Sequence, residues 1–107
     1  MMDKEINAVD ANKLRRQNAD VILLDVREDS ELEICKIEGA SHIPMNKLLE
    51  QSDSLPKDRP IIVFCHHGMR SMHVVRYLES IGFDKVTSMR GGIHAWSNEV
   101  DPRIHKY

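Results

Sequence analysis

The sequence predicts an α/β domain in which strands and helices alternate along the chain. Residues 21–26 and 61–64 are short apolar runs rich in branched side chains, a pattern typical of strands buried in a parallel sheet. Residues 72–81 instead repeat apolar side chains at helical spacing. Because further strand-like and helical segments alternate around these three, the pattern indicates the α/β class.

Caps and chain breakers, together with periodicity, define the remaining elements. We expect Asp10 to cap a helix that runs through Arg16, and Asp29 or Ser30 to cap a short acidic helix that ends near Ile34. The expected order is a helix from residue 10, a strand over 21–26, a helix over 29–34, a short strand over 39–44, one or two helical turns over 46–51, a strand over 61–64, a helix over 72–81, a strand over 85–89 and a last helix over 93–100.

Composition limits the class of protein. A chain of 107 residues with 41% hydrophobic content can bury one core, so we expect a single domain over residues 1–107. The 15 basic and 17 acidic residues are intermixed, which argues against a nucleic-acid partner. No segment is typical of a signal peptide or a membrane span, so we expect a cytoplasmic protein without a membrane partner. Cys35 and Cys65 have different surroundings, which argues against a disulfide framework and favours a reducing compartment.

Cys65 stands where the strand over 61–64 meets the loop before the next helix. The unpaired N–H groups of a helix's first turn favour a thiolate over a thiol, and Arg70 adds a positive charge to the same loop. Gly68 can adopt the positive φ that lets successive N–H groups converge on an anion. A cysteine that is only a small buried side chain would need neither residue. We therefore predict that Cys65 is a nucleophile.

Four separated segments have a recognisable pattern. They are D-V-R-E at 25–28, G-A-S-H-I-P at 39–44, C-H-H-G-M-R at 65–70 and G-G-I-H-A-W at 91–96. In this order they resemble the motifs of the rhodanese family of sulfurtransferases, in its single-domain form. Each motif alone is weak, since C-x4-R arises by chance, but the four together are specific and cover nearly the whole chain.

The resemblance implies a rhodanese-like fold, a central parallel five-stranded sheet with helices on both faces, and catalysis without a metal or organic cofactor. Cys65 would take sulfane sulfur from thiosulfate or glutathione persulfide, hold it as a persulfide and pass it to a nucleophilic acceptor, small molecule or protein. We expect the loop to contact the substrate and three other residues to support it. The first group is His66, His67, Gly68, Met69 and Arg70, and the second is Asp25, Arg27 and Ser71.

The chain departs from the family pattern at two places. His66 and His67 stand where thiosulfate-using members often have arginine or lysine. Histidine is only fractionally charged near neutral pH, so we expect thiosulfate to bind weakly. Cys35 and Lys36 replace a glycine and a histidine in the family's G-H-I-x-G-A stretch. We expect Cys35 to be a packed structural residue rather than a resolving thiol.

Three other functions are weighed against the sulfurtransferase. The first is a rhodanese-like module for docking or regulation in a sulfur-relay assembly. Such modules often lack the cysteine, so the presence of Cys65 favours an enzyme. Phosphatases of related fold resemble C-x5-R, whereas four residues separate Cys65 from Arg70, which removes up to about 3.5 Å of chain from the anion cradle. A zinc site at His66 and His67 is not expected, because consecutive side chains in a loop diverge and the usual zinc spacings are missing.

Overall fold

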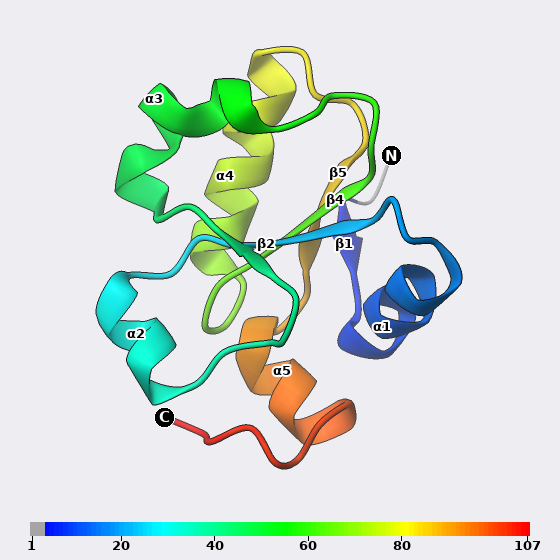
Figure 1. Cartoon of the computed structure of the whole chain (residues 1–107), viewed down its shortest axis with the longest axis vertical. Coiled ribbons are helices and arrows are strands. Elements are labelled where there is room, and N and C mark those ends of the chain that lie inside the picture. Colours follow the sequence, from blue (N-terminus) through cyan, green and yellow to red (C-terminus); the bar gives the residue numbers. More distant parts are fainter. Residues whose placement is uncertain (1–3) are drawn as a thin grey trace.

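Five parallel strands organise the part of the chain that the computed structural model describes, residues 4–107 (Figure 1). The strands are β1 (Glu5–Ile6), β2 (Ile22–Asp25), β3 (Ser41–His42), β4 (Ile61–Phe64) and β5 (Val86–Met89). They form one sheet in the order β1-β5-β4-β2-β3, with parallel pairing throughout. The predicted α/β class and five-stranded parallel sheet are therefore confirmed.

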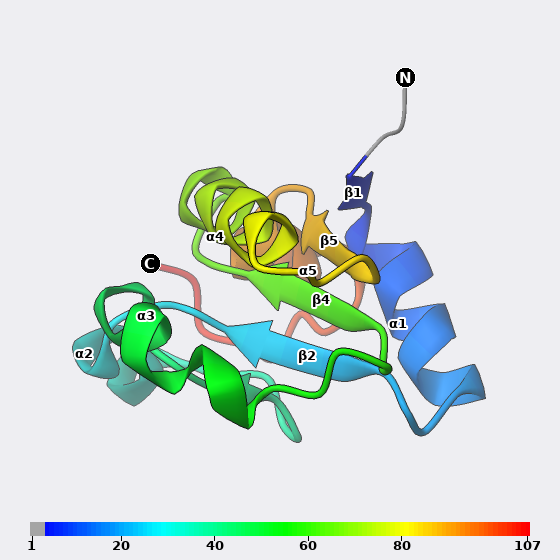
Figure 2. The same cartoon turned by 90° about the horizontal axis from the view of Figure 1, so that it is seen from above.

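Helices cover both faces of this sheet, as the view from above in Figure 2 shows. They are α1 (Ala8–Gln17), α2 (Asp29–Ile34), α3 (Leu48–Gln51), α4 (Met69–Ser80) and α5 (Gly92–Glu99), with 3₁₀ turns at Met45–Lys47 and Ser52–Ser54. Side chains of α3 and α4 enter one core cluster, and side chains of α1 and α5 enter the other. The sheet therefore lies between two apolar layers.

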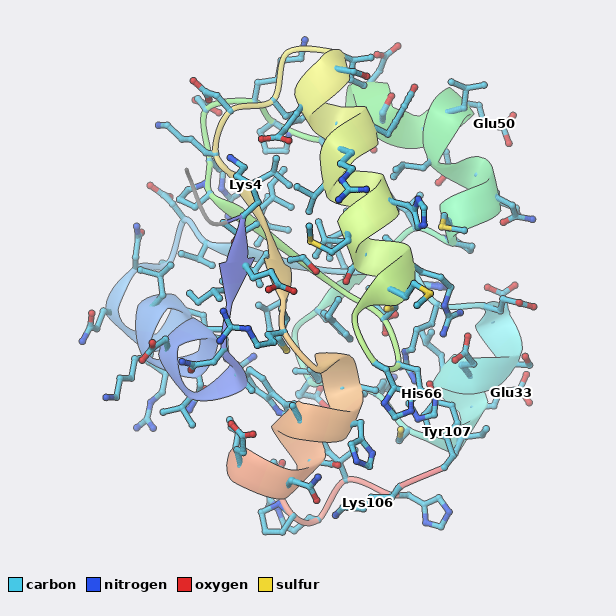
Figure 3. All side chains as sticks on the ribbon, turned by 180° about the vertical axis from the view of Figure 1, so that it is seen from behind. Lys4, Glu33, Glu50, His66, Lys106 and Tyr107 are labelled. Carbon is cyan, nitrogen blue, oxygen red and sulfur yellow. The ribbon has the colours of Figure 1, made fainter. Side chains whose placement is uncertain are left out.

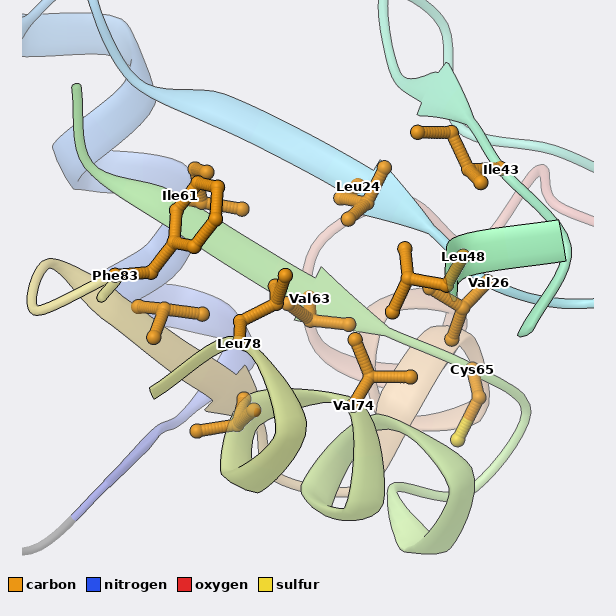
Figure 4. Packing of buried hydrophobic residues seen from close by; sticks show 12 residues of the cluster. Leu24, Val26, Ile43, Leu48, Ile61, Val63, Cys65, Val74, Leu78 and Phe83 are labelled. Carbon is orange, nitrogen blue, oxygen red and sulfur yellow. The ribbon is translucent and has the colours of Figure 1, made fainter. Parts of the chain in front are cut away.

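The alternation of side chains along β4 explains why both layers are apolar. Ile61 and Val63 belong to the cluster on the α4 face, while Ile62 and Phe64 belong to the cluster on the α5 face. All four are at most 1% exposed. Successive side chains of a strand point to opposite faces, so a central parallel strand has to be apolar at every position. Figure 4 shows Ile61 and Val63 packed with Leu78 of α4.

Two helices have different N-terminal caps from those expected. The side chain of Asn7 caps α1 by accepting the N–H of Asp10 at 2.8 Å, so Asp10 lies inside the first turn. Glu28 precedes α2, and its N–H donates to Glu31 Oε1 at 3.0 Å in a capping box. In both helices several neighbouring polar side chains could accept hydrogen bonds from the free N–H groups of the first turn. The sequence pattern does not show which of them is the cap.

One helix boundary and one strand also differ from the expected elements. Helix α4 begins at Met69 rather than residue 72, because Gly68 adopts a φ of 112° and turns the chain directly into the helix. Strand β1 was not expected, since a two-residue strand is too short to show periodicity. It pairs with β5 and forms one of the two edge strands of the sheet.

Every helix within residues 4–107 is too short or too polar to span a membrane. The start of the chain, in which no signal peptide is expected, includes residues 1–3, which lie outside the described part. Strands β2, β4 and β5 all end at the same edge of the sheet, and α4 and α5 begin there. Open parallel sheets bind their ligands at this carboxyl edge, and Cys65 lies on it.

Candidate active site

Cys65 follows β4 directly and is the first residue of the loop that leads into α4. Its side chain is 1% exposed and belongs to the core cluster on the α4 face. The main-chain N–H of Gly68 donates to Cys65 Sγ at 3.0 Å, and Sγ lies 3.7 Å from Ser71 Oγ. In Figure 4 the sulfur points toward the first turn of α4. An N–H group and a helix start aimed at Sγ stabilise negative charge on the sulfur.

Ser71 ties the loop to the sheet. It is fully buried, and its Oγ donates to the carbonyl of Gly68 at 3.0 Å. The same Oγ lies 2.6 Å from Ser88 Oγ in β5. Ser71 therefore holds the left-handed Gly68, and with it the N–H that faces Cys65, in place.

The start of α5 holds the other side of the loop. The N–H of Ile93 donates to the carbonyl of Cys65 at 2.8 Å, and the N–H of His94 donates to that of His66 at 3.1 Å. Gly92 makes this approach possible, because a Cβ there would overlap the carbonyl oxygens of Cys65 and His66. The sequence motif at 91–96 marked a turn and a helix, but it did not indicate this contact with the nucleophile's loop.

Arg70 is paired with a residue that the sequence analysis did not assign to the site. Its guanidinium donates to both carboxylate oxygens of Glu31, at 2.6 and 2.9 Å. The hydrogen bonds from Arg70 lower the pKa of Glu31 to about 2, and those to Glu31 raise the pKa of Arg70. The positive charge expected in the loop therefore lies in the first turn of α4, where it is paired with the Glu31 carboxylate of α2.

Asp25 and Arg27 form a buried ion pair at the end of β2. The Arg27 guanidinium donates to the Asp25 carboxylate at 2.8 to 3.2 Å and is fully buried. It also donates to the carbonyl of Cys35 at 2.8 Å and lies 3.9 Å from Cys35 Sγ. These contacts fasten the end of α2 to the sheet, and the pair makes no contact with Cys65 among the hydrogen bonds of the described residues.

Tyr107 closes the network, although no motif indicated it. Its hydroxyl accepts from Arg27 at 2.9 Å and donates to Glu31 Oε2 at 2.7 Å. Its ring stacks on that of His66, with centroids 3.8 Å apart and planes 5° apart. Burial raises the pKa of Tyr107 to about 12. The end of the described chain thus lies against the active-site loop, as the labels in Figure 3 show.

The exposed face of the loop consists of His67 and Met69. Met69 is 78% exposed, which leaves it free to meet a substrate or partner. His66 is half-buried below Tyr107, and burial lowers its pKa, with the neighbouring His67 adding to the effect. The sequence predicted only a fractional positive charge at His66, and the lowered pKa of its side chain reduces that charge further.

The side chains of His66 and His67 do not diverge as expected. Their ring centroids are 4.0 Å apart, and His94 of α5 approaches the same point, 4.9 Å from the His67 ring. One ring nitrogen from each of the three lies within 4.8 Å of the others. Among the residues that the structure describes, this is a cluster of ligand type that could hold a metal.

The chain belongs to the rhodanese-like domain family, whose model matches residues 8–99. It is 36% identical over 96 residues to the thiosulfate sulfurtransferase GlpE of Coxiella burnetii, covering 90% of this chain and 89% of that protein. It is 34% identical over 102 residues to a sulfurtransferase of Allochromatium vinosum, covering 92% and 95%. The expected family is therefore confirmed.

Solved structures agree with this fold. A rhodanese-related protein of Thermoplasma volcanium superposes with a TM-score of 0.82 at 33% identity, covering 91% of this chain and 93% of that one. A rhodanese-like domain protein of Staphylococcus aureus gives a TM-score of 0.83 at 31% identity, covering 97% and 98%. The whole described domain, including the carboxyl edge that carries Cys65, thus has the rhodanese-like architecture.

Proposed function

We propose that this chain is a rhodanese-type sulfurtransferase, acting as a single domain, that carries sulfane sulfur on Cys65 as a persulfide. The proposal depends above all on the N–H of Gly68, which lies 3.0 Å from Sγ at the start of α4. A persulfide carries negative charge on its outer sulfur, and N–H groups at a helix start stabilise such charge. The relatives named sulfurtransferases support the same activity.

The proposed first step loads the sulfur. The Cys65 thiolate attacks the outer sulfur of thiosulfate, a new S–S bond forms, and the S–S bond of the donor breaks as sulfite leaves with the bonding electrons. With glutathione persulfide as donor, the glutathione thiolate is the leaving group instead. In the second step a nucleophile such as cyanide attacks the outer sulfur, thiocyanate leaves, and the Cys65 thiolate is restored.

Access to the sulfur is the main geometric demand of this mechanism. Only 1% of Cys65 is exposed, so side chains over the site have to move aside before a donor can reach Sγ. The loop's carbonyls are held by α5 and its Gly68 by Ser71, which leaves the side chains of His67 and Met69 as the outer wall. An exposed wall of this kind also suits transfer to an acceptor protein.

The pairing of Arg70 argues for sulfur rather than phosphate chemistry. A phosphatase loop needs its arginine free to grip phosphate oxygens, whereas both arms of Arg70 are occupied by Glu31. Sulfur transfer needs only a stabilised thiolate.

Both cysteines are free thiols, which fits a reducing compartment such as the cytoplasm.

The direct test is intact-mass spectrometry of protein incubated with thiosulfate or, separately, with glutathione persulfide. We expect a gain of one sulfur atom that cyanide removes as thiocyanate. Cys65→Ser should abolish the gain, and Cys35→Ser, the matched control, should keep it. Loading with glutathione persulfide alone would retain the mechanism and change the donor. Loading that survives Cys65→Ser, or none from either donor, would overturn the proposal.

A further inference from the structure

Three histidines form a cluster at the active-site loop, and their ring nitrogens make or break no bond in the sulfur transfer proposed above. His66 and His67 come from the loop after β4, and His94 comes from the first turns of α5. A ring nitrogen of each lies within 4.8 Å of the other two. Three imidazoles brought this close from two separate elements are a common ligand set for zinc.

Two of these rings have a buried nitrogen that nothing within residues 4–107 satisfies. His66 Nε2 and His94 Nδ1 are both shielded from solvent and have no hydrogen-bond partner there. Buried polar atoms in folded proteins are nearly always paired, so two orphan nitrogens in one cluster indicate a binding site for a further ligand. A metal ion accepts both lone pairs at once, provided that each imidazole presents its unprotonated nitrogen.

The cluster is also partly preorganised. The N–H of His94 donates to the carbonyl of His66 at 3.1 Å, which fixes the two residues relative to each other. Stacking on Tyr107 fixes the plane of the His66 ring. His67 is exposed, so its ring can rotate inward. In a tetrahedral zinc site the nitrogens are about 3.3 Å apart, given Zn–N bonds of about 2.0 to 2.1 Å, so the rings need only a modest contraction.

We propose that His66, His67 and His94 bind one divalent first-row transition metal ion, with Zn²⁺ as the best match. Imidazole nitrogen suits Zn²⁺ and its neighbours in the series, whereas Mg²⁺ and Ca²⁺ require oxygen ligands. Three protein ligands leave a fourth position open to water or an anion. The site is distinct from the sulfur carrier because Cys65 supplies none of its ligands.

The test uses protein in which both thiols are removed, Cys35→Ser with Cys65→Ser, so that sulfur ligands cannot contribute. Isothermal titration with Zn²⁺ should show one ion bound per chain. Titration with Co²⁺ should give the visible absorption of a four-coordinate nitrogen site. Adding His94→Ala should weaken Zn²⁺ binding by about tenfold or more, and so should His67→Ala, whose exposed side chain carries no risk to folding.

The matched control is His73→Ala, since His73 is an exposed histidine of α4 outside the cluster. Its variant should bind Zn²⁺ like the parent protein. The proposal is overturned if the thiol-free protein binds no Zn²⁺, if binding persists undiminished in His94→Ala and His67→Ala, or if His73→Ala weakens it equally. Sulfur loading is not measured in these titrations, so their outcome is independent of the proposed sulfurtransferase.

Discussion

Arg70, in the first turn of α4, and Glu31 of α2 form an ion pair through two hydrogen bonds of 2.6 and 2.9 Å. The pair is partly shielded, since the two side chains are 30% and 16% exposed. Through Tyr107, the Glu31 carboxylate is also linked to the buried Arg27. The start of α4, which follows the Cys65 loop, is therefore tied to α2 and, through Tyr107, to Arg27 after the end of β2.

Replacing Arg70 by lysine should weaken this connection. Lysine keeps the charge but cannot form two parallel hydrogen bonds, so Arg70→Lys should lower the free energy of unfolding by about 1 kcal/mol. Urea denaturation measures the change. Arg103→Lys is the control, because Arg103 pairs with Asp101 in similar geometry while 89% exposed, and its substitution should leave stability unchanged. Equal effects in both variants would contradict the stabilising role of the pair.

The lowered pKa of Glu31 predicts a pH dependence of stability. Its folded value is about 2 against an ordinary 4.5, so the stability that its carboxylate contributes is complete above 4.5 and is lost as the pH falls toward 2. After allowing for solvent screening, we expect a loss of about 1 to 2 kcal/mol in this window. Glu31→Gln should flatten this part of the profile in urea denaturation at several pH values. An unchanged slope would show that other carboxylates cause it.

Gly92 should tolerate no side chain. Gly92→Ala would force a Cβ into the carbonyl oxygens of Cys65 and His66 at a φ of +61°. We expect a loss of stability above about 2 kcal/mol and slower sulfur loading of Cys65. Gly39→Ala is the matched control, since Gly39 also has a positive φ, +85°, but open space around its Cβ position. Backbone strain alone should cost this control about 1 kcal/mol.

The hydroxyl of Tyr107 should contribute to stability apart from its ring. Tyr107→Phe keeps the stacking on His66 but leaves Arg27 and Glu31 each without one hydrogen bond. We expect a loss of about 1 to 2 kcal/mol in urea denaturation. Tyr77→Phe serves for comparison, because the Tyr77 hydroxyl has no hydrogen bond within residues 4–107, and it should be nearly neutral. A neutral Tyr107→Phe would mean that the bridge is not stabilising.

Features encoded within a few neighbouring residues were the ones that could be predicted. The apolar run over 61–64 specifies a strand, because every position of a central parallel strand is buried. Gly68 after Cys65 specifies a positive φ, because other residues rarely adopt one. The class, the parallel sheet and the position of the candidate nucleophile followed from such local patterns and from the resemblance that they support.

Partners far apart in the sequence could not be predicted in the same way. Glu31 is 39 positions from Arg70, and Tyr107 is 76 positions from Glu31, so nothing in the local pattern joins them. The convergence of His94 with His66 and His67 likewise depends on how α5 packs against the loop.

Local sequence patterns thus specified strands β2 to β5, the helices and the place of Cys65 at a strand end, because dihedral preferences and burial patterns act over a few residues. The packing of distant segments added three contacts that these patterns do not encode: Arg70 pairs with Glu31, Tyr107 stacks on His66, and the rings of His66, His67 and His94 come together. These contacts arise because the strand order β1-β5-β4-β2-β3 brings distant segments to one edge of the sheet, and the spacing of no single motif specifies that order.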